Sequence, residues 1–169
     1  TKEDRIALLE TFYTLYKKRW NDITDAIIPE MGAPKDFASK LQTGTGASHT
    51  KSFIRYLKEF EFEKPLGDHA KNQRLLYEPK GVCALITPWN WPMNQVCLKV
   101  IPALASGCTM ILKPSELAPL SAMVLAELID EAKFPKGVFN LVNGDGETTG
   151  DALTCLLYTS DAADDLDRG

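Results

Sequence analysis

The first third of the chain places apolar residues every three or four positions, a pattern that predicts helices. Thr1 followed by Asp4 is a start signal for the first helix. The second is predicted to end at Gly32 and Pro34, and the third to span residues 48–60. The three apolar faces contain Ile6, Leu9, Tyr13 and Tyr16; Trp20, Ile23, Ile27 and Met31; and Phe53, Tyr56, Leu57 and Phe60.

Residues 61–79 lose this helical period. They contain Pro65, Gly67 and the apolar triplet at 75–77. We interpret the segment as irregular or strand-like.

From Gly81 onward, short apolar runs at 82–86, 109–112 and 138–142 alternate with helical patterns. The first run is typical of a strand buried on both faces. The helix after Pro92 is expected to be interrupted at Pro102. This alternation predicts an α/β fold with a parallel sheet, in which ligands bind beyond the carboxyl ends of the strands.

The helix between the second and third strands is expected to begin near Pro119, a residue suited to a first helical turn. Its buried stripe is predicted to contain Leu120, Val124 and Leu128, with Leu125 and Ile129 beside them.

Composition narrows the class of protein. Of 169 residues, 44% are hydrophobic and 25% charged, and the net charge is -4. These are values of a soluble globular protein. Nucleic acids and anionic membranes attract basic surfaces, so neither is favoured as a partner. Apolar runs are too short to span a bilayer, and no secretory signal is seen, although the first residue is Thr1 rather than Met.

The four cysteines and two histidines show no spacing typical of a metal or redox site, so no metal ligand is predicted. Cys83, Cys97 and Cys108 lie among apolar neighbours, where a thiol behaves as a small hydrophobe. Free thiols of this kind are typical of the cytoplasm. His49 and His69 are expected to be solvated.

Asn90 follows the first strand, in a turn that two prolines and two tryptophans stiffen. A side-chain amide held at the end of a parallel strand can donate a hydrogen bond to a developing oxyanion. Asn is also common as a turn or capping residue, and spacing alone favours that second interpretation.

Lys113 and Glu116 follow the second strand, where they are placed to bind ribose hydroxyls; an ordinary solvated charge pair is the alternative. Gly144, Gly146 and Gly150 follow the third strand, where they either let the backbone approach a cofactor or simply form turns. No Gly-x-Gly-x-x-Gly follows the first strand, so a dinucleotide is not held as in an ordinary Rossmann dehydrogenase.

Taken together, these loops resemble the aldehyde dehydrogenase superfamily. The resemblance is carried by the runs at 77–82, 86–92, 102–108, 113–116, 119–121, 137–142 and 144–146, and by Glu30-Met31-Gly32. It covers residues 1–154 and implies the N-terminal part of the cofactor-binding domain. The implied fold is α/β, with N-terminal helices followed by an incomplete Rossmann-like parallel sheet that binds NAD(P).

The resemblance also implies a role for single residues. Asn90 would supply the side chain of the oxyanion hole. The carboxylate of Glu116 favours NAD over NADP, whereas the small Ser115 leaves tolerance for NADP. The cofactor-binding residues implied by the resemblance are Ile86, Thr87, Pro88, Trp89, Lys113, Ser115, Glu116, Gly146 and Gly150.

In this family, a cysteine thiolate attacks the aldehyde to give a thiohemiacetal, hydride passes to the nicotinamide, and a glutamate-activated water releases the acid. Both groups lie downstream of the matched region, and none of the four cysteines occupies the nucleophile's motif. We therefore expect that this chain does not oxidise aldehydes by itself.

Two further segments carry expectations. The resemblance implies that residues 61–78 are strands that help to build the oligomer, a homodimer or homotetramer. Residues 155–169 match nothing in the family and are interpreted as a foreign tail. Two rival functions stay open: a CoA-acylating family member, and a catalytically dead nucleotide-binding or assembly module.

Overall fold

The computed structural model describes residues 1–155, so the predicted foreign tail lies outside the described residues, apart from Cys155. In chain order the elements are α1 (Lys2–Lys18), α2 (Trp20–Met31), α3 (Lys35–Phe37), a π-helical segment (Ala38–Thr43), α4 (Gly44–Glu59), β1 (Glu63–Pro65), a 3₁₀ turn (Asp68–Ala70), β2 (Arg74–Leu76), β3 (Val82–Ile86), α5 (Pro92–Ser106), β4 (Thr109–Lys113), α6 (Leu120–Glu131), β5 (Phe139–Leu141), a second π-helical segment (Gly146–Gly150) and α7 (Asp151–Thr154).

The start of α1 and the end of α2 lie at the predicted signals. The Thr1 hydroxyl accepts a hydrogen bond from the Asp4 amide, and the Asp4 carboxylate accepts one from the Thr1 amino group. This reciprocal capping satisfies amide groups that the first helical turn leaves unpaired. Gly32 ends α2 in the left-handed conformation, with φ of +66°, which confirms the predicted stop.

Helix α4 begins four residues earlier than predicted, after a short helix and a π-helical segment that the pattern did not indicate. Gly44 and Gly46 hid this start, because glycine has low helix propensity. Gly46 has a packing role instead. A methyl group there would overlap the Tyr16 hydroxyl and lie 3.1 Å from the Cys97 sulfur, so glycine lets α4 approach α1 and α5 closely.

The expectation that Tyr56 and Phe60 are buried is wrong. Tyr56 is 53% exposed and Phe60 41% exposed. The buried stripe of α4 instead runs through Ala47, Ile54 and Leu57 toward α1 and α5. Tyr56 therefore lies on the outer side of the helix.

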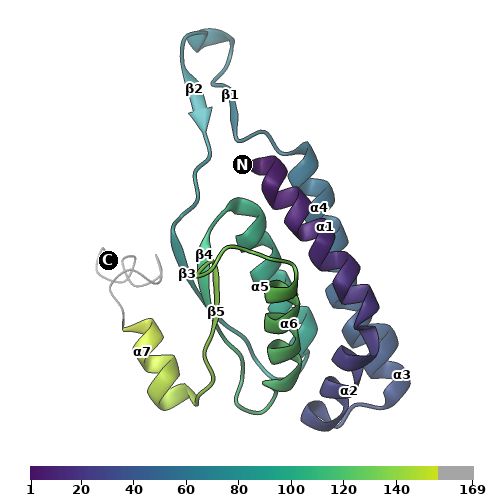
Figure 1. Ribbon diagram of the computed structural model, residues 1–169. Coiled ribbons are helices and arrows are strands. Elements are labelled where there is room, and N and C mark those ends of the chain that lie inside the picture. The colour runs from purple at the N-terminus through teal and green to yellow at the C-terminus, as the bar shows by residue number, and fades with distance from the viewer. Residues whose placement is uncertain (156–169) are drawn as a thin grey trace.

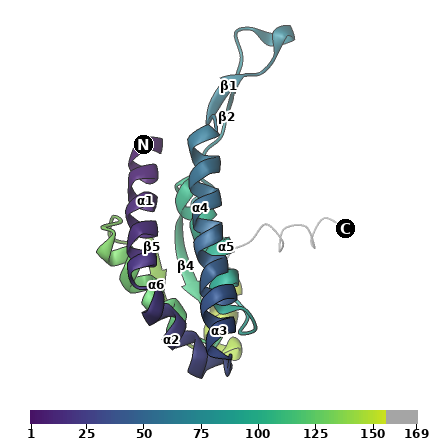
Figure 2. The ribbon, with the colours of Figure 1, turned by 90° about the vertical axis from the view of Figure 1, so that its right-hand side faces the viewer.

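Strands β1 and β2 pair antiparallel, with Glu63 opposite Leu76, which confirms the strand-like interpretation of this segment. The hairpin projects away from the helices and the sheet in both views (Figures 1 and 2). Phe60, Phe62 and Tyr77 meet at its base, with the Phe60 ring centroid 4.8 Å from that of Phe62 and 5.1 Å from that of Tyr77.

Strands β3, β4 and β5 form a parallel sheet in that order, as the alternation of strands and helices predicted. Cys83 lies opposite Met110, which lies opposite Phe139, and these residues face the core. The α/β fold class is confirmed. In the described part of the chain, no helix is long and apolar enough to cross a membrane.

The predicted interruption of α5 at Pro102 is wrong, because the helix continues to Ser106. Proline lacks an N–H group and leaves the carbonyl four residues earlier without its helical partner. That carbonyl belongs to Leu98, which is exposed, so water can take the place of the missing donor.

The buried stripe of α6 is rotated from the prediction. Leu120 is exposed and Val124 only partly buried, whereas Leu125, Leu128 and Ile129 are buried. Helix α6 contacts α1, α2 and α5 as well as β5, so several neighbours determine which of its side chains are buried.

The molecule has three layers: the sheet, then α5 and α6, then α1, α2 and α4 (Figure 1). Figure 2 shows α1 and α4 side by side in the outer layer. The expectation that β3 is buried on both faces is wrong, since Val82 is 59% exposed and the strand is only partly buried. Strand β3 lies at one end of the described sheet, and the helices cover the face that carries Cys83 and Met110.

Candidate functional site

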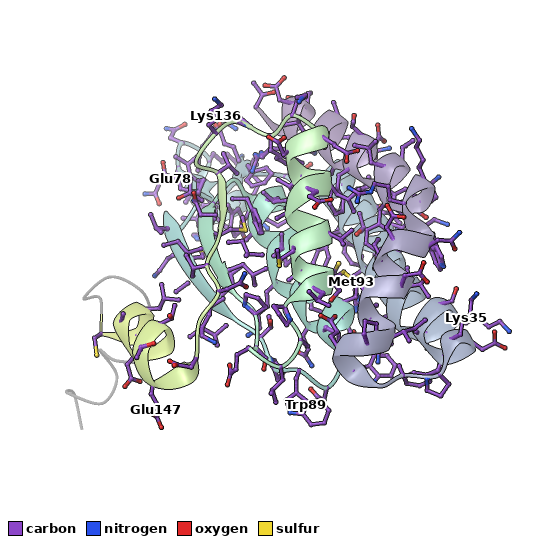
Figure 3. The ribbon with its side chains drawn as sticks, turned by 60° about the horizontal axis from the view of Figure 1, so that its bottom comes forward. Lys35, Glu78, Trp89, Met93, Lys136 and Glu147 are labelled. Atoms are coloured by element: carbon purple, nitrogen blue, oxygen red, sulfur yellow. The ribbon has the colours of Figure 1, made fainter. Side chains whose placement is uncertain are left out.

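The loops that carry the candidate residues lie on one edge of the sheet. In Figure 3, Trp89 follows β3 and Glu147 follows β5, and both lie at the bottom of the view. Glu78 precedes β3 and Lys136 precedes β5, and both lie at the top. The carboxyl ends of the parallel strands therefore share an edge, where ligands bind in folds of this kind.

The loop after β3 is tied down at its start. Thr87 is buried, and its amide donates a hydrogen bond to the Lys113 carbonyl oxygen at 3.1 Å. The Lys99 ammonium donates to the Ile86 carbonyl at 2.6 Å. Ile86, Pro88 and Trp89 remain exposed, with Trp89 50% exposed. A fixed backbone thus presents an apolar surface at the edge of the sheet.

Asn90 lies in this turn, and it does not cap the following helix. The cap position of α5 is held by Trp91, with no side-chain hydrogen bond, so the capping interpretation of Asn90 is wrong. The Trp91 ring lies edge-on to Phe37, with 5.8 Å between ring centroids, and Pro92 begins the helix. The exposed Asn90 side chain is therefore carried by a turn that its neighbours hold in place.

Lys113 and Glu116 form an ion pair at the end of β4. Lys113 is 2% exposed, and its ammonium lies 3.3 Å from a Glu116 carboxylate oxygen and 3.2 Å from the Pro114 carbonyl oxygen. A hydrogen bond from its own backbone amide, followed by the bond from Lys113, lowers the pKa of Glu116. The buried lysine thus holds an exposed carboxylate in its ionised form.

The predicted residue Ser115 has a local structural contact. Its hydroxyl accepts a hydrogen bond from the Leu117 amide at 3.2 Å. This bond shapes the turn that carries Glu116 outward from the strand.

Asp145 was missed as a site residue, although its position after the third strand was a usable signal. Its carboxylate accepts a hydrogen bond from the Thr148 amide at 2.8 Å and another from the Thr148 hydroxyl. These bonds, first from the side chain and then from the backbone of Thr148, lower the pKa of Asp145, and the charge of Lys113 acts in the same direction. Lys113 therefore faces two carboxylates.

The structure brings Gly150 next to this cluster. A methyl group added to Gly150 would lie 4.0 Å from the Lys113 Cε atom, whereas one added to Gly146 would meet open space. Of the predicted glycines, Gly150 thus contacts the lysine stem and Gly146 lies on an open surface. In the described part of the chain, no three His, Cys, Asp or Glu side chains are grouped to hold a metal ion.

The cysteines differ from one another more than the sequence suggested. Burial raises the pKa of Cys97 to about 12, which agrees with an inert core thiol. Burial also raises the pKa of Cys83. The pKa of Cys108 is lowered instead, because hydrogen bonds, first that from the Ser106 hydroxyl, outweigh the effect of burial. Each of these three lies away from the edge that carries Asn90 and Glu116.

Comparisons with known proteins agree with this arrangement. The model of the aldehyde dehydrogenase family matches residues 1–156. A 3-succinoylsemialdehyde-pyridine dehydrogenase from Pseudomonas is 49% identical over 154 residues, which are 90% of this chain and 31% of the relative. The chain thus spans about a third of the length of the curated relatives it matches.

Three solved structures superpose on most of this chain. An aldehyde dehydrogenase from Bartonella henselae superposes with a TM-score of 0.91 at 52% identity, over 94% of this chain and 33% of that one. A mutant of aldehyde dehydrogenase C from Pseudomonas syringae, in complex with NAD+ and octanal, gives 0.89 at 41% identity, over 94% and 32%. An NADP-dependent enzyme from E. coli gives 0.85 at 35% identity, over 94% and 33%.

Proposed function

Because the chain belongs to the aldehyde dehydrogenase family, we propose that residues 86–150 bind NAD(P)+ and serve the oxidation of an aldehyde to a carboxylic acid. One observation carries the proposal: the Thr87 amide donates to the Lys113 carbonyl at 3.1 Å and joins the loops after β3 and β4. This bond holds the Asn90 turn beside the Lys113–Glu116 pair. An oxyanion donor and a nucleotide-binding pair are thereby set on one edge of the sheet.

Lys113 and Glu116 fit the hydroxyl groups of a ribose. The Lys113 ammonium is a donor and the Glu116 carboxylate is an acceptor, and a ribose hydroxyl can both accept and donate. The lysine is buried and the carboxylate exposed, so the pair presents its acceptor outward. Gly146 leaves open space nearby, where a larger side chain would crowd a flat base.

The loop after β3 would contact the reacting groups, which are the aldehyde and the nicotinamide. Asn90 donates its amide N–H to the aldehyde oxygen as negative charge develops there. Exposed Ile86 and Trp89 give an apolar surface that excludes water from the reacting groups. A nicotinamide cofactor, when bound, supplies the hydride acceptor.

We infer a preference for NAD over NADP from the ionised state of Glu116. Its carboxylate accepts hydrogen bonds from free ribose hydroxyls and repels a 2′-phosphate. Ser115, whose hydroxyl is occupied by the Leu117 amide, adds no positive charge that would attract the phosphate. NADP remains a weaker ligand of the same edge.

Isothermal titration of the chain with NAD and NADP tests the proposal. Glu116→Gln is expected to weaken NAD binding roughly tenfold, which corresponds to the loss of one charge-assisted hydrogen bond. It should also reduce the difference between the affinities for NAD and NADP. The matched control is Lys136→Gln, an exposed change on the opposite edge of the sheet (Figure 3), which should leave both affinities unchanged. Equal NAD affinity for the Glu116→Gln variant and the parent chain would contradict the assignment.

The proposal includes no turnover by this chain alone, because none of its four cysteines occupies the motif of the family's nucleophile. Formation of NADH from octanal, followed by absorbance, should match the rate without protein. Aldehyde-dependent NADH formation that survives replacement of each cysteine by serine would refute the cysteine chemistry.

The described cysteines are free, and a reducing cytoplasm is the compartment that we propose.

The β1–β2 hairpin supports a proposed role in assembly. It projects from the body (Figures 1 and 2), and the side chains of Leu66, Leu76 and Tyr77 are exposed along it. Apolar groups on an isolated hairpin gain stability when a second chain covers them. We propose that residues 61–78 contact another copy in a dimer or tetramer.

A further inference from the structure

The segment after β5 folds back along the end of β4 and brings Asp145 to Lys113. The Val142 amide donates a hydrogen bond to the Leu112 carbonyl at 2.9 Å, so the chain leaves β5 beside the end of β4. The Gly150 amide then donates to the Asp145 carbonyl at 3.1 Å and closes a tight turn. A methyl group on Gly150 would lie 3.7 Å from that carbonyl oxygen and 4.0 Å from the Lys113 Cε atom. Gly150 thus lies between the Asp145 backbone and the stem of the lysine.

The exposed Asp145 side chain is held in place by two hydrogen bonds. One of its carboxylate oxygens, Oδ1, accepts from the Thr148 amide at 2.8 Å and from the Thr148 hydroxyl at 2.5 Å. These bonds, and after them the charge of Lys113, lower the pKa of Asp145, so its carboxylate is ionised at neutral pH. Asp145 therefore adds a fixed negative charge at the carboxyl edge of the sheet.

Lys113, Glu116 and Asp145 form one charged cluster. The buried Lys113 ammonium lies 3.3 Å from a Glu116 carboxylate oxygen, and its charge also acts on Asp145. Hydrogen bonds from its own backbone amide and from Lys113 lower the pKa of Glu116, whereas the charge of Asp145 acts against them. The two carboxylates therefore repel each other beside a single ammonium, and the cluster has one negative charge in excess.

We propose that Asp145 is a specificity-determining residue of the cofactor edge, where its charge adds to that of Glu116 and disfavours a 2′-phosphate. The assignment rests on the proposed binding of NAD(P)+ by residues 86–150 and adds a residue that does not have to touch the ribose. The Asp145 carboxylate is bonded to Thr148 and acts on the cofactor through its charge. NADP carries a 2′-phosphate with roughly two negative charges, where NAD carries a neutral hydroxyl. Loss of the Asp145 charge should therefore favour NADP more than NAD.

Asp145→Asn in the 169-residue chain removes this charge and keeps the turn, because an Asn side-chain oxygen can also accept from the Thr148 amide. Isothermal titration at 0.15 M salt should show the ratio of NADP affinity to NAD affinity rise roughly fivefold, the effect of one charge acting through solvent on a doubly charged phosphate. The pyrophosphate is common to both cofactors, so the ratio isolates the 2′ position. The rise should shrink in 1 M salt, where the screening length is about 3 Å.

The matched control is Glu147→Gln, which removes a carboxylate from the same segment. The Glu147 side chain points away from the sheet (Figure 3), so the affinity ratio should stay within about twofold of the parent value. The double variant Glu116→Gln/Asp145→Asn leaves the Lys113 ammonium without either carboxylate. In that variant NADP should bind more tightly than NAD. If the double variant does not fold, the comparison of Asp145→Asn with Glu147→Gln still decides.

A second measurement requires no cofactor. NMR titration of the side-chain carboxyl carbons should give a lower pKa for Glu116 in Asp145→Asn than in the parent chain, because a repelling charge is gone. An unchanged pKa of Glu116, an unchanged affinity ratio with NAD still bound, or a rise that persists in 1 M salt would overturn the role of Asp145 and leave the cofactor role standing. Absence of NAD binding by the parent chain would instead overturn the cofactor role, and the specificity assignment with it.

Discussion

Glu30, near the end of α2, joins two helices that are far apart in the sequence. Its carboxylate accepts from the Leu120 amide at 2.6 Å and from the Ser121 amide at 3.2 Å. These are the first two residues of α6, whose amides have no partner within their own helix. A carboxylate at a helix amino end is also favoured by the helix dipole. A side chain of one helix therefore caps another.

The pKa of Glu30 predicts a pH dependence. Burial raises the pKa, and this outweighs the hydrogen bonds from Ser121 and Leu120, which act in the opposite direction. A carboxyl group with a raised folded-state pKa stabilises the fold fully below its unfolded pKa, and this contribution is lost as pH rises through the folded pKa. Glu30→Gln removes the titration. The free energy of unfolding of the parent chain should therefore fall relative to this variant between about pH 4 and pH 7, the range above the ordinary glutamate pKa.

Urea unfolding of both proteins at several pH values measures this difference. Asp25→Asn, an exposed change in the same helix α2, is the control and should show no such trend. A difference that stays constant, or that grows in favour of the parent chain as pH rises, would contradict the raised pKa of Glu30.

The candidate site residues differ in how well they can be predicted from their positions in the sequence. Lys113 and Glu116 were predicted as candidates because charged residues directly after a buried strand must lie at its carboxyl end. The position of Asp145 after the third strand was a signal, but the effect of the Lys113 charge on it depends on where β5 lies relative to β4, which spacing along the chain does not give. The lowered pKa of Cys108 depends first on the nearby Ser106 hydroxyl and then on backbone groups of residues 80 and 81.

Among the elements, α4 depends most strongly on one small residue. Gly46→Ala would place a methyl group onto the Tyr16 hydroxyl, which donates to the Thr43 carbonyl at 2.9 Å in the core. We expect the free energy of unfolding to fall by about 1–3 kcal/mol, the usual cost of overpacking. Gly44→Ala is the matched control, because its new methyl group would meet only ordinary contacts at 3.8 Å. It should stabilise by up to about 1 kcal/mol through helix propensity. Chemical denaturation of both variants gives the two values, and equal effects would refute the packing role.

The type and order of the main helices and of the parallel strands were predictable, because helical spacing ends near residue 60 and short apolar runs that alternate with helices begin after Gly81. The predictions that failed concern the orientation of the buried helix faces and the length of the helices. Pro102 was assigned an interruption because its position on an exposed side of α5 cannot be read from the sequence. The stripe of α6 was misplaced because it depends on a second neighbour, α2. Tyr56 was assigned to the core because apolar character alone does not distinguish a core face from an exposed aromatic group.

At the scale of the molecule, Arg19 joins the outer helical layer to the middle layer through two of its three ion pairs. It lies between α1 and α2, and its guanidinium binds Asp22 at 2.7 Å, Glu127 at 2.8 Å and Glu131 at 2.9 Å. The last two belong to α6. One side chain thus connects the outer helical layer to the middle layer.

Replacing Arg19 by glutamine should lower the free energy of unfolding by about 1 kcal/mol, at the upper end for partly exposed pairs, because three contacts are lost at once. The loss should shrink in 1 M salt, where the screening length falls to about 3 Å. Lys40→Gln, which breaks the exposed pair with Asp36, should change stability little. Thermal unfolding at low and high salt provides the comparison. An Arg19 effect that is independent of salt would mean that packing, rather than charge, joins the layers.

The layers do not enclose the hairpin, since β1 and β2 pair with each other and project from the body (Figures 1 and 2). A two-stranded hairpin is only marginally stable, so trypsin should cut the native chain first after Lys71, an exposed residue in the turn between the strands. Lys71→Gln should slow this first cut, whereas the exposed helical Lys17→Gln should not. If residues 61–78 contact a second copy, cleavage should also slow as protein concentration rises, because association covers the turn. Cleavage that begins within α1 or α5 would show that the helical layers open before the hairpin does.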